Sequence, residues 1–548
     1  MFESTMFLQR ASDHEHQTKK TPKYRSRILI QTNMTMKNNY LTAIFASLMV
    51  LAGCNQFDEL EDIRRVDFDA EYAVPLVDTR TTMRDILRDF ETIGSLTIDP
   101  DGLFRFRYQQ EVVTQNSQDI FNQINAALPP IIPVSSPFMA LPFASPDGLE
   151  IDRLDLKKGS MIYFFENRHS EMVTVTMTFP QVTKGGVPLV FRQTVSGYSG
   201  SGNAPAGTNL LFPASLAGYT IATENDSIYV QYEAIRASGQ KDTLSSVFLR
   251  LQDLEFSYAE GYFGNFLYEG TRDTLSIDFF DNWIRGDIYF EEPRITLLVE
   301  NSFGIPTRSV VNALNVITVK KDVLPLKSIF VDNGIDFPYP GFNEVGQVKT
   351  GAFSFTKQNS NIDVILGAGP IAIDYDVDAI TNPDNDPGIR GFIAEDSYYR
   401  VNMEVELPMY GQASGFVAVE NFAVDFKNYT DVSDVEFKVV VDNAIPLAID
   451  IQAYFLDSNN QIIDSLLAAP QRFAEAAPVD AQGLVTGETR TVSYAFYSGP
   501  RFERIKDESV RLLLNTAISS LNNGTKSVKL FSQQDVKVKI GAKLGVRK

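Results

Sequence analysis

The strongest constraint on the fold is a period of two in the polarity of the side chains. Stretches such as EMVTVTMTF (171–179), DSIYVQYEAI (226–235) and VEFKVVVDN (435–443) alternate between apolar and polar residues. This alternation is typical of strands with one buried and one solvated face. Gly, Asn, Asp and Pro punctuate the segments between them. The sequence therefore predicts a mainly β protein of tandem antiparallel β-sandwich domains, immunoglobulin-like in architecture.

Only two short segments carry a helical pattern. In 81–90, Thr82 is placed as an N-cap with Asp85 three residues on, and in 117–128, Ser117 precedes an apolar stripe. The first is a capping-box arrangement. We expect both helices to cover the edge or end of a sheet.

Three stretches share one plan of strand, asparagine, short turn and strand: 159–179, 294–317 and 435–456. Their asparagines are Asn167, Asn301 and Asn443, spaced 134 and 142 residues apart. An asparagine side chain bonds the backbone two residues on and suits a turn between strands. The spacing predicts domain-sized repeats with these asparagines as equivalent structural turns.

The strand pattern and the repeats suggest three divisions of the folded chain. We expect β structure with two short helices in 71–250, a β-sandwich in 251–395 and a C-terminal β-sandwich in 396–548.

The single cysteine, Cys54, marks the end of an apolar run. The run covers residues 41–52, which is too short to cross a bilayer, since a span needs about 20 residues. It fits the central region of a signal peptide covering 36–53. Residues 1–35 follow no period and are expected to be an artefact of an upstream start codon, with a long basic leader as the alternative.

The residues around Cys54 resemble two signals of bacterial lipoproteins. Leu51-Ala52-Gly53-Cys54 resembles a lipobox, in which the cysteine is acylated by chains such as palmitate. The acidic tether 54–70, with Asp58, Glu59, Glu61 and Asp62, is similar to the export signal of surface lipoproteins of Bacteroidota. The resemblance implies lipid attachment at Cys54 and an outer-membrane location facing the cell exterior. A buried structural cysteine, a merely solvated tether and a periplasmic orientation remain alternatives.

One repeat also resembles a known fold family. The strand before Asn301 and the Gly304-Ile305-Pro306 turn resemble the late-embryogenesis-abundant type 2 β-sandwich. The overall plan is similar to large uncharacterised Bacteroidota lipoproteins, for which no activity is established.

Net charge narrows the choice of partners. Without residues 1–53 the chain keeps 42 basic and 66 acidic residues, a net charge of −24. Such a surface repels nucleic acids and anionic headgroups. We expect contact with the membrane through the anchor on Cys54, an outer-membrane or surface protein as partner, and no nucleic acid.

Residues suited to catalysis are scarce. His169 is the only histidine after residue 53, and Cys54 is the only cysteine, so histidine–cysteine zinc sites are excluded by count. We therefore expect no enzyme and no cofactor, although paired carboxylates of a hydrolase stay open as an alternative. The candidate metal site is a calcium loop formed by Asp384, Asn385 and Asp386, whose oxygen ligands suit that ion.

Four Asp-Ser/Thr-aliphatic triplets resemble the O-glycosylation motif of Bacteroidota. The candidate acceptors are Ser227, Thr243, Thr274 and Ser465.

These observations favour a non-enzymatic, lipid-anchored outer-membrane protein. It would present β-sandwich modules to a partner protein or polymer, or serve as an accessory subunit of an outer-membrane complex. The alternative is a glycan-binding lipoprotein of a polysaccharide-uptake system, which several exposed aromatic residues on one sheet face would favour.

Overall fold

The computed structural model describes residues 71–88, 95–127, 129, 131–142, 149–224, 227–280, 285–426 and 431–546. The expected start artefact 1–35, signal peptide 36–53 and tether 54–70, including Cys54, lie outside the described residues. The prediction of a mainly β fold with a few short helices is confirmed, with several antiparallel sheets that account for 58% of the described residues as strand.

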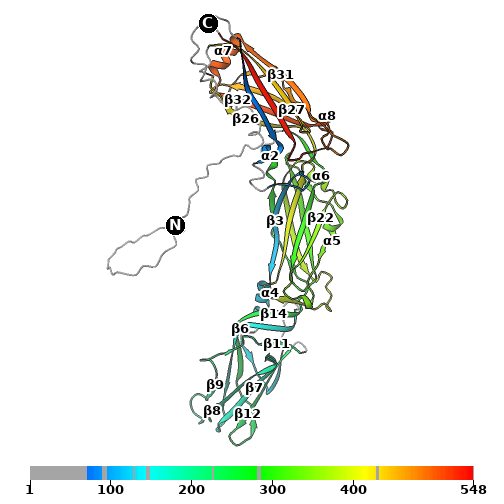
Figure 1. Cartoon of the computed structure of the whole chain (residues 1–548). Helices are drawn as coiled ribbons and strands as arrows, with labels where there is room; N and C mark the ends of the chain where they lie inside the picture. The colour runs from blue at the N-terminus through cyan, green and yellow to red at the C-terminus, as the bar shows by residue number, and fades with distance from the viewer. Residues whose placement is uncertain are drawn as a thin grey trace, which may run out of the picture. The chain divides into compact units, whose positions relative to one another are not determined.

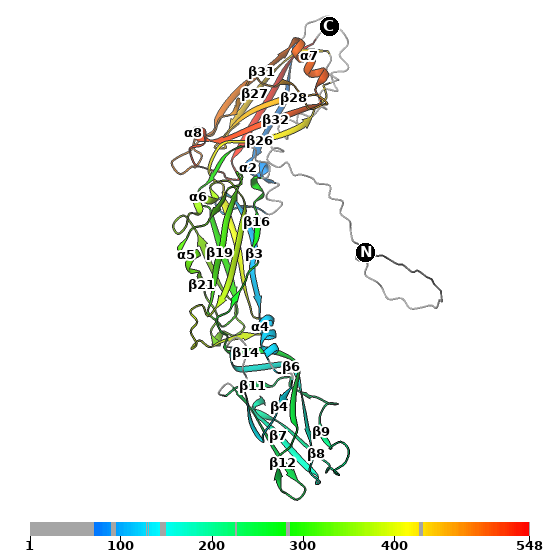
Figure 2. The same cartoon turned by 180° about the vertical axis from the view of Figure 1, so that it is seen from behind.

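The first pair of sheets combines the beginning of the described chain with its end. We call it the outer sandwich. One sheet has the order β1-β34-β27-β31, with the bounds Glu71–Thr82, Asp535–Val546, Val432–Asn443 and Thr489–Ser498. The other sheet contains β17 (Arg285–Phe290), β26 (Tyr410–Ala423), β28 (Leu447–Leu456), β29 (Ile462–Ser465), β30 (Gln471–Ala474), β32 (Arg511–Ser520) and β33 (Val528–Lys529). Figure 1 shows the blue β1 among the orange and red strands, and Figure 2 shows β26, β28 and β32 from behind.

The second pair of sheets forms the middle sandwich. Its first sheet contains β2 (Leu96–Ile98), β3 (Phe104–Asn116), β18 (Arg294–Asn301), β22 (Lys349–Phe355) and β25 (Tyr398–Pro408). Its second sheet contains β15 (Leu267–Tyr268), β16 (Asp273–Ser276), β19 (Thr307–Thr318), β20 (Val323–Pro325), β21 (Ile335–Phe337) and β23 (Pro370–Thr381). A buried bond of 2.8 Å between the hydroxyls of Tyr399 and Ser309 joins the two sheets.

The inner sandwich is built mainly from residues 132–262. Its long strands are β6 (Glu150–Glu166), β7 (Val173–Lys184), β8 (Val187–Val195), β12 (Ser227–Arg236) and β14 (Val247–Tyr262). The short ones are β4 (Ile132–Pro133), β5 (Phe138–Pro142), β9 (Ala206–Thr208), β10 (Ala214–Ser215), β11 (Thr220–Ala222), β13 (Lys241–Asp242) and β24 (Gly391–Ala394). Because β11 pairs with both β6 and β7, it joins the sheet that contains β6 to the sheet that contains β7.

All three sandwiches share one topology of eight strands. Numbered in chain order, the first sheet has the order 6-3-8-1 and the second has the order 5-4-7-2. Strands one to eight are β1, β26, β27, β28, β30, β31, β32 and β34 in the outer sandwich, β3, β16, β18, β19, β21, β22, β23 and β25 in the middle one, and β4, β5, β6, β7, β8, β9, β12 and β14 in the inner one. The domain-sized repeat is therefore one of strand pairing as well as of sequence.

The sandwiches are nested in the chain. The middle sandwich lies between strands one and two of the outer sandwich, and the inner one lies between strands one and two of the middle sandwich. Strands one and two form an edge of each eight-strand set, so an insertion there leaves the ladders of strands three to eight intact. The expected divisions 71–250, 251–395 and 396–548 do not coincide with the sheets, because β1 pairs with β34 and β3 pairs with β25 across them.

The helices are short and lie at connections. They are α2 (Met83–Ile86), α4 (Ser117–Ala127), α5 (Ile329–Asn333), α6 (Ile362–Leu366), α7 (Gly499–Glu508) and α8 (Leu521–Gly524), with 3-10 turns η4 (Asp278–Phe280) and η5 (Phe342–Glu344). The predicted capping box is confirmed, since the Thr82 hydroxyl accepts from the Asp85 amide at 3.1 Å. Within the expected segment 81–90 the helix begins only at Met83, because residues 81 and 82 still pair with β34, and residues 89 and 90 lie outside the described residues.

The three repeat asparagines occupy the same place in their sandwiches. Each lies at the end of strand three, where the chain leaves for strand four, and each is buried. Each side-chain oxygen accepts from the amide two residues on, at 3.0, 2.9 and 2.9 Å for His169, Phe303 and Ile445. Each side-chain NH₂ donates to the carbonyl of the residue after strand five, at 2.9, 3.3 and 2.8 Å for Ser196, Pro338 and Glu475. The asparagine thus connects the end of strand three to the end of strand five.

We predict that Asn443→Asp lowers the free energy of unfolding by about 1–3 kcal/mol, because the carbonyls of Leu447 and Glu475 lose their donor while a carboxylate becomes buried. Chemical denaturation followed by circular dichroism measures this change. Asn421→Asp, at an exposed position of β26 in the same sandwich, is the matched control and should stay within about 0.5 kcal/mol. Equal losses in the two variants would contradict a structural role for the asparagine turn.

Candidate functional site

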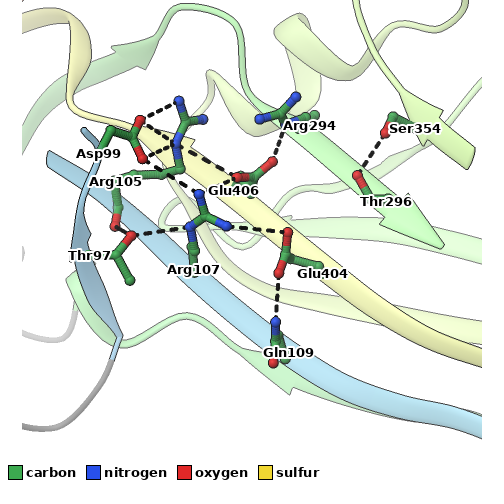
Figure 3. A network of polar contacts seen from close by, with 10 residues as sticks. All are labelled: Thr97, Asp99, Arg105, Arg107, Gln109, Arg294, Thr296, Ser354, Glu404 and Glu406. Atoms are coloured by element: carbon green, nitrogen blue, oxygen red, sulfur yellow. Dashed lines mark hydrogen bonds and ion pairs between the residues drawn. The ribbon is translucent and has the colours of Figure 1, made fainter. Parts of the chain in front are cut away.

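The densest group of charges lies on the first sheet of the middle sandwich. Figure 3 shows Arg105 and Arg107 of β3 beside Glu404 and Glu406 of β25, with Arg294 of β18 on the far side of Glu406. These strands are neighbours in the order β3-β25-β18, and Glu406 stands opposite both Arg107 and Arg294. Side chains directly opposite each other on antiparallel strands are close enough to pair.

Carboxylates and guanidinium groups alternate across this network. Asp99, in the β2–β3 turn, accepts from Arg105 at 2.8 Å and lies 3.5 Å from Arg107. Glu406 lies 3.3 Å from Arg107 and accepts a bond from Arg294. Its side chain is only 3% exposed, so an unpaired carboxylate there would be strongly disfavoured. Three arginines thus balance the three carboxylates of Asp99, Glu404 and Glu406.

Two opposing effects, burial and the neighbouring arginines, act on the pKa of the Asp99 carboxyl. Burial alone would raise the pKa of the Asp99 carboxyl, since it disfavours the charged form. The hydrogen bond and the positive charge of Arg105, with a contribution from Arg107, outweigh burial, so that the pKa lies below its usual value. The carboxylate is therefore held ionised as a partner of the arginines.

This arrangement suits the support of a sheet better than acid–base chemistry. A general acid needs a carboxyl that keeps its proton near neutral pH. Asp99, Glu404 and Glu406 all lie within ion-pair distance of an arginine instead. The network also lies where the β2–β3 hairpin meets the outer sandwich, because the amide of Phe104 donates to the carbonyl of Leu530 at 3.1 Å. The network therefore ties strands of the middle sandwich together beside its connection to the outer one.

The sequence contains a pattern of alternating charges that could have predicted this network. FRFRYQ (104–109) places arginines on the same face of one strand, and MEVELP (403–408) places glutamates on one face of another. Opposite charges at a period of two on two strands indicate pairing between them. The separation of about 300 residues hid the match, since only the fold brings the two strands together.

His169 lies in a small polar group of the inner sandwich. Its Nδ1 atom is 2.8 Å from Arg236 and 3.4 Å from Asp242, and its Nε2 atom is 3.2 Å from the carbonyl of Thr243. The His169 side chain is only 22% exposed, since Arg236 and Asp242 lie against the ring. Asp242 forms an ion pair with Arg236, so the histidine joins an existing charge pair.

The three residues of the candidate calcium loop each contact a different partner. Asp384 is exposed and lies 3.5 Å from Arg308, Asn385 accepts from the Tyr262 hydroxyl at 3.2 Å, and Asp386 accepts from the amide of Gly388 at 2.8 Å. Among the described residues, no group of three or more histidine, cysteine, aspartate or glutamate side chains is arranged to hold a metal ion.

The candidate glycosylation acceptors differ in accessibility. Thr243 and Thr274 are exposed, whereas Ser227 and Ser465 are half-buried. The Ser465 hydroxyl already donates to the carbonyl of Leu467 at 2.8 Å. In three triplets the aspartate accepts from the amide of the following Ser or Thr, at 2.7–2.8 Å, which fixes the local backbone.

An apolar tip on the inner sandwich was missed by sequence reasoning. Strand six is continuous in the outer and middle sandwiches, but in the inner one it is split into β9 and β10 by residues 209–213. This excursion exposes three neighbouring side chains, Leu210, Leu211 and Phe212, by 60%, 86% and 85%. We call these three residues the apolar tip.

Asn209 holds the base of the apolar tip. Its side chain accepts from the amide of Tyr163 at 2.8 Å and donates to the carbonyl of Met161 at 2.9 Å. It thereby replaces the backbone bonds that an unbroken strand six would make with β6. The amide of Phe212 donates to the carbonyl of Asn209 at 2.9 Å and closes a tight turn. The apolar tip therefore rests on an ordered base.

A second exposed apolar row lies on β31 of the outer sandwich. Val492, Tyr494 and Phe496 point to the solvated face of this edge strand and are 46%, 56% and 60% exposed. The Lys438 ammonium lies 5.8 Å from the centre of the Tyr494 ring, within reach of a cation–π contact.

In the part of the chain that the structure describes, every helix is too short or too polar to cross a bilayer.

We predict that the Asp99 network makes stability depend on acid. The lowered pKa of Asp99 means that its contribution is present above about pH 4 and is lost as the pH falls through the folded-state value. Asp99→Asn should lower the free energy of unfolding at pH 7 by about 1–3 kcal/mol and should lose less further stability than the wild type between about pH 4 and pH 2. Urea unfolding at several pH values measures both effects.

Asp78→Asn is the control, since Asp78 is an exposed residue whose carboxylate lies 3.5 Å from Lys539. It should follow the wild-type pH profile. A parallel profile for Asp99→Asn and the wild type would contradict the role given to the network.

Comparisons with known proteins add little to this description. No family model matches the chain, and no curated protein matches it. Among solved structures, a Parabacteroides distasonis protein described as a "putative secreted protein" is 10% identical, with 87% of this chain and 99% of that chain covered and a TM-score of 0.28. An infectious bursal disease virus particle is 10% identical, with 78% and 77% covered and a TM-score of 0.13. Sulfolobus Turreted Icosahedral Virus is 11% identical, with 76% and 85% covered and a TM-score of 0.11. These TM-scores are too low for any of the three to support an argument about this chain.

Proposed function

We propose that this protein is a non-enzymatic binding protein, anchored by a lipid on Cys54 to the outer membrane, facing the cell exterior. It binds a partner protein through its β-sandwich modules. The observation that carries the proposal is the apolar tip at Leu210, Leu211 and Phe212.

Exposed apolar side chains are common one at a time, but a contiguous group marks a contact surface. Here the chain breaks strand six and uses Asn209 to rebuild its bonds, while the other two sandwiches keep that strand whole. A feature present in one copy of a repeat and absent from the others points to a use beyond folding. Leucine and phenylalanine on an ordered turn also lose little conformational freedom when they bind.

A glycan-binding role is the second candidate. Tyr494 and Phe496 are exposed on one face of β31, two residues apart. This is the arrangement of aromatic side chains on one sheet face that favours stacking against sugar rings. The row is short, and β31 is an edge strand, so we rank this role below protein binding.

We predict that Leu211→Ser combined with Phe212→Ser abolishes the capture of a specific membrane protein from solubilised cell envelopes. The apolar contact area is lost, while Asn209 keeps the turn in place. Quantitative mass spectrometry of the captured proteins gives the readout. Ile462→Ser, which removes a side chain 59% exposed on β29, is the control and should capture the same protein as the wild type.

Three other outcomes would count against protein binding at the apolar tip. Equal capture by both variants would place any partner elsewhere. Capture of no specific protein by the wild type would remove the basis for the proposal. Retention on a polysaccharide column that Tyr494→Ala abolishes would favour the glycan-binding role instead.

Anchoring is tested separately. We predict that an alkyne fatty acid labels the wild type in cells and does not label Cys54→Ser, because Cys54 is the only thiol in the chain. Protease added to intact cells should degrade the wild type if it faces outward. Equal labelling of the two proteins would refute lipid attachment at Cys54, and protection in intact cells would indicate a periplasmic orientation.

A further inference from the structure

The outer sandwich contains an apolar cavity of about 150 Å³ between its two sheets. Ile449 of β28 lines it from one sheet, and Val538 of β34 lines it from the other. Met83 and Leu87, in and just after α2, together with Phe279 of η4, close one end. The cavity therefore lies where the chain passes from strand one of the outer sandwich into the middle sandwich.

The lining is apolar throughout its interior. It contains no charged side chain, and Gln412 is its one amide side chain. Water in a cavity needs two to four polar partners, and an apolar cavity of similar size in another protein stays dry and takes up benzene or xenon. This cavity is therefore suited to a hydrocarbon group.

The cavity is open on one side. Tyr289 of β17 and Tyr410 and Gln412 of β26 are lining residues that are half-exposed. Polar groups gather next to them: Gln412 donates to the Ser527 hydroxyl at 3.1 Å, and the Lys529 ammonium lies 4.8 Å from the centre of the Tyr410 ring. A ligand that enters here would meet polar groups at the opening and apolar ones inside.

The helix at this end of the cavity differs in length from its counterpart in the middle sandwich. A helix follows strand one in both the outer and the middle sandwich. In the middle sandwich it is α4, of 11 residues, which buries Ile120, Phe121 and Ile124. In the outer sandwich it is α2, of four residues. The apolar residues Met83, Ile86 and Leu87, in and just after α2, line the cavity at this end.

We propose that this cavity binds the hydrocarbon end of an amphiphile, with the polar head at the opening beside Gln412 and Lys529. This site is independent of the apolar tip and of the partner proposed above. Its ligand class is an amphiphile with a linear alkyl chain, because the interior is apolar and the polar groups lie only at the opening.

The test is a chain-length series of linear alcohols, from butanol to decanol, titrated calorimetrically into the full chain carrying Cys54→Ser. This change removes the only thiol and allows purification without detergent. Affinity should rise roughly fourfold with each added methylene. It should stop rising once the chain fills the cavity. Absence of binding, or a rise that continues through decanol, would overturn the proposal.

A filled cavity provides the second arm. Ala413→Leu adds apolar volume at a lining residue and should weaken hexanol binding at least tenfold, whereas Ala423→Leu on the exposed end of the same strand should leave it unchanged. Equal affinities in the two variants would overturn the proposal. If Ala413→Leu does not fold, Ile518→Ala serves instead, since enlarging the cavity should move the end of the rise to longer alcohols. An unchanged series in that variant would also overturn it.

Discussion

The pairing of β1 with β34 is the constraint on which the rest of the structure depends. These strands match at eleven positions, and the ion pair between Arg80 and Asp535 joins residues 455 apart in sequence. Closing so long a loop costs conformational entropy, although the cost grows only slowly with length. Because the middle and inner sandwiches lie within that loop, their folding removes most of its flexible length. Nesting and closure thus support each other.

Backbone hydrogen bonds connect the outer and middle sandwiches where the chain passes between them. In segment 529–535 of the outer sandwich, the carbonyls of Gln534 and Leu530 accept from the amides of Met83 and Phe104. The amide of Leu530 donates to the carbonyl of Met409. The exit and re-entry points of the insertion are therefore tied to one stretch of backbone. The arginine–carboxylate network beside it fixes β2 and β3 to β25.

Three copies of one topology allow the chain to be compared with itself. In all three copies the asparagine at the end of strand three accepts a bond from the amide two residues on, which indicates a structural role. Other places differ between the copies: strand six is broken only in the inner copy, and the helix after strand one has four residues in the outer copy and 11 in the middle one. The first departure gives the apolar tip, and the second lies at one end of the apolar cavity.

The sequence by itself determined the strands, the turns at Asn167, Asn301 and Asn443, and the cap at Thr82, because alternation, turn chemistry and capping act over a few residues. It could not reveal that the domains are nested, that Arg107 meets Glu406 or that Leu211 is exposed. Those facts depend on pairing between strands far apart in the chain, and a local pattern does not encode its partner. An apolar residue such as Leu211 is the same letter whether buried or exposed, and only the tertiary structure decides whether another side chain covers it.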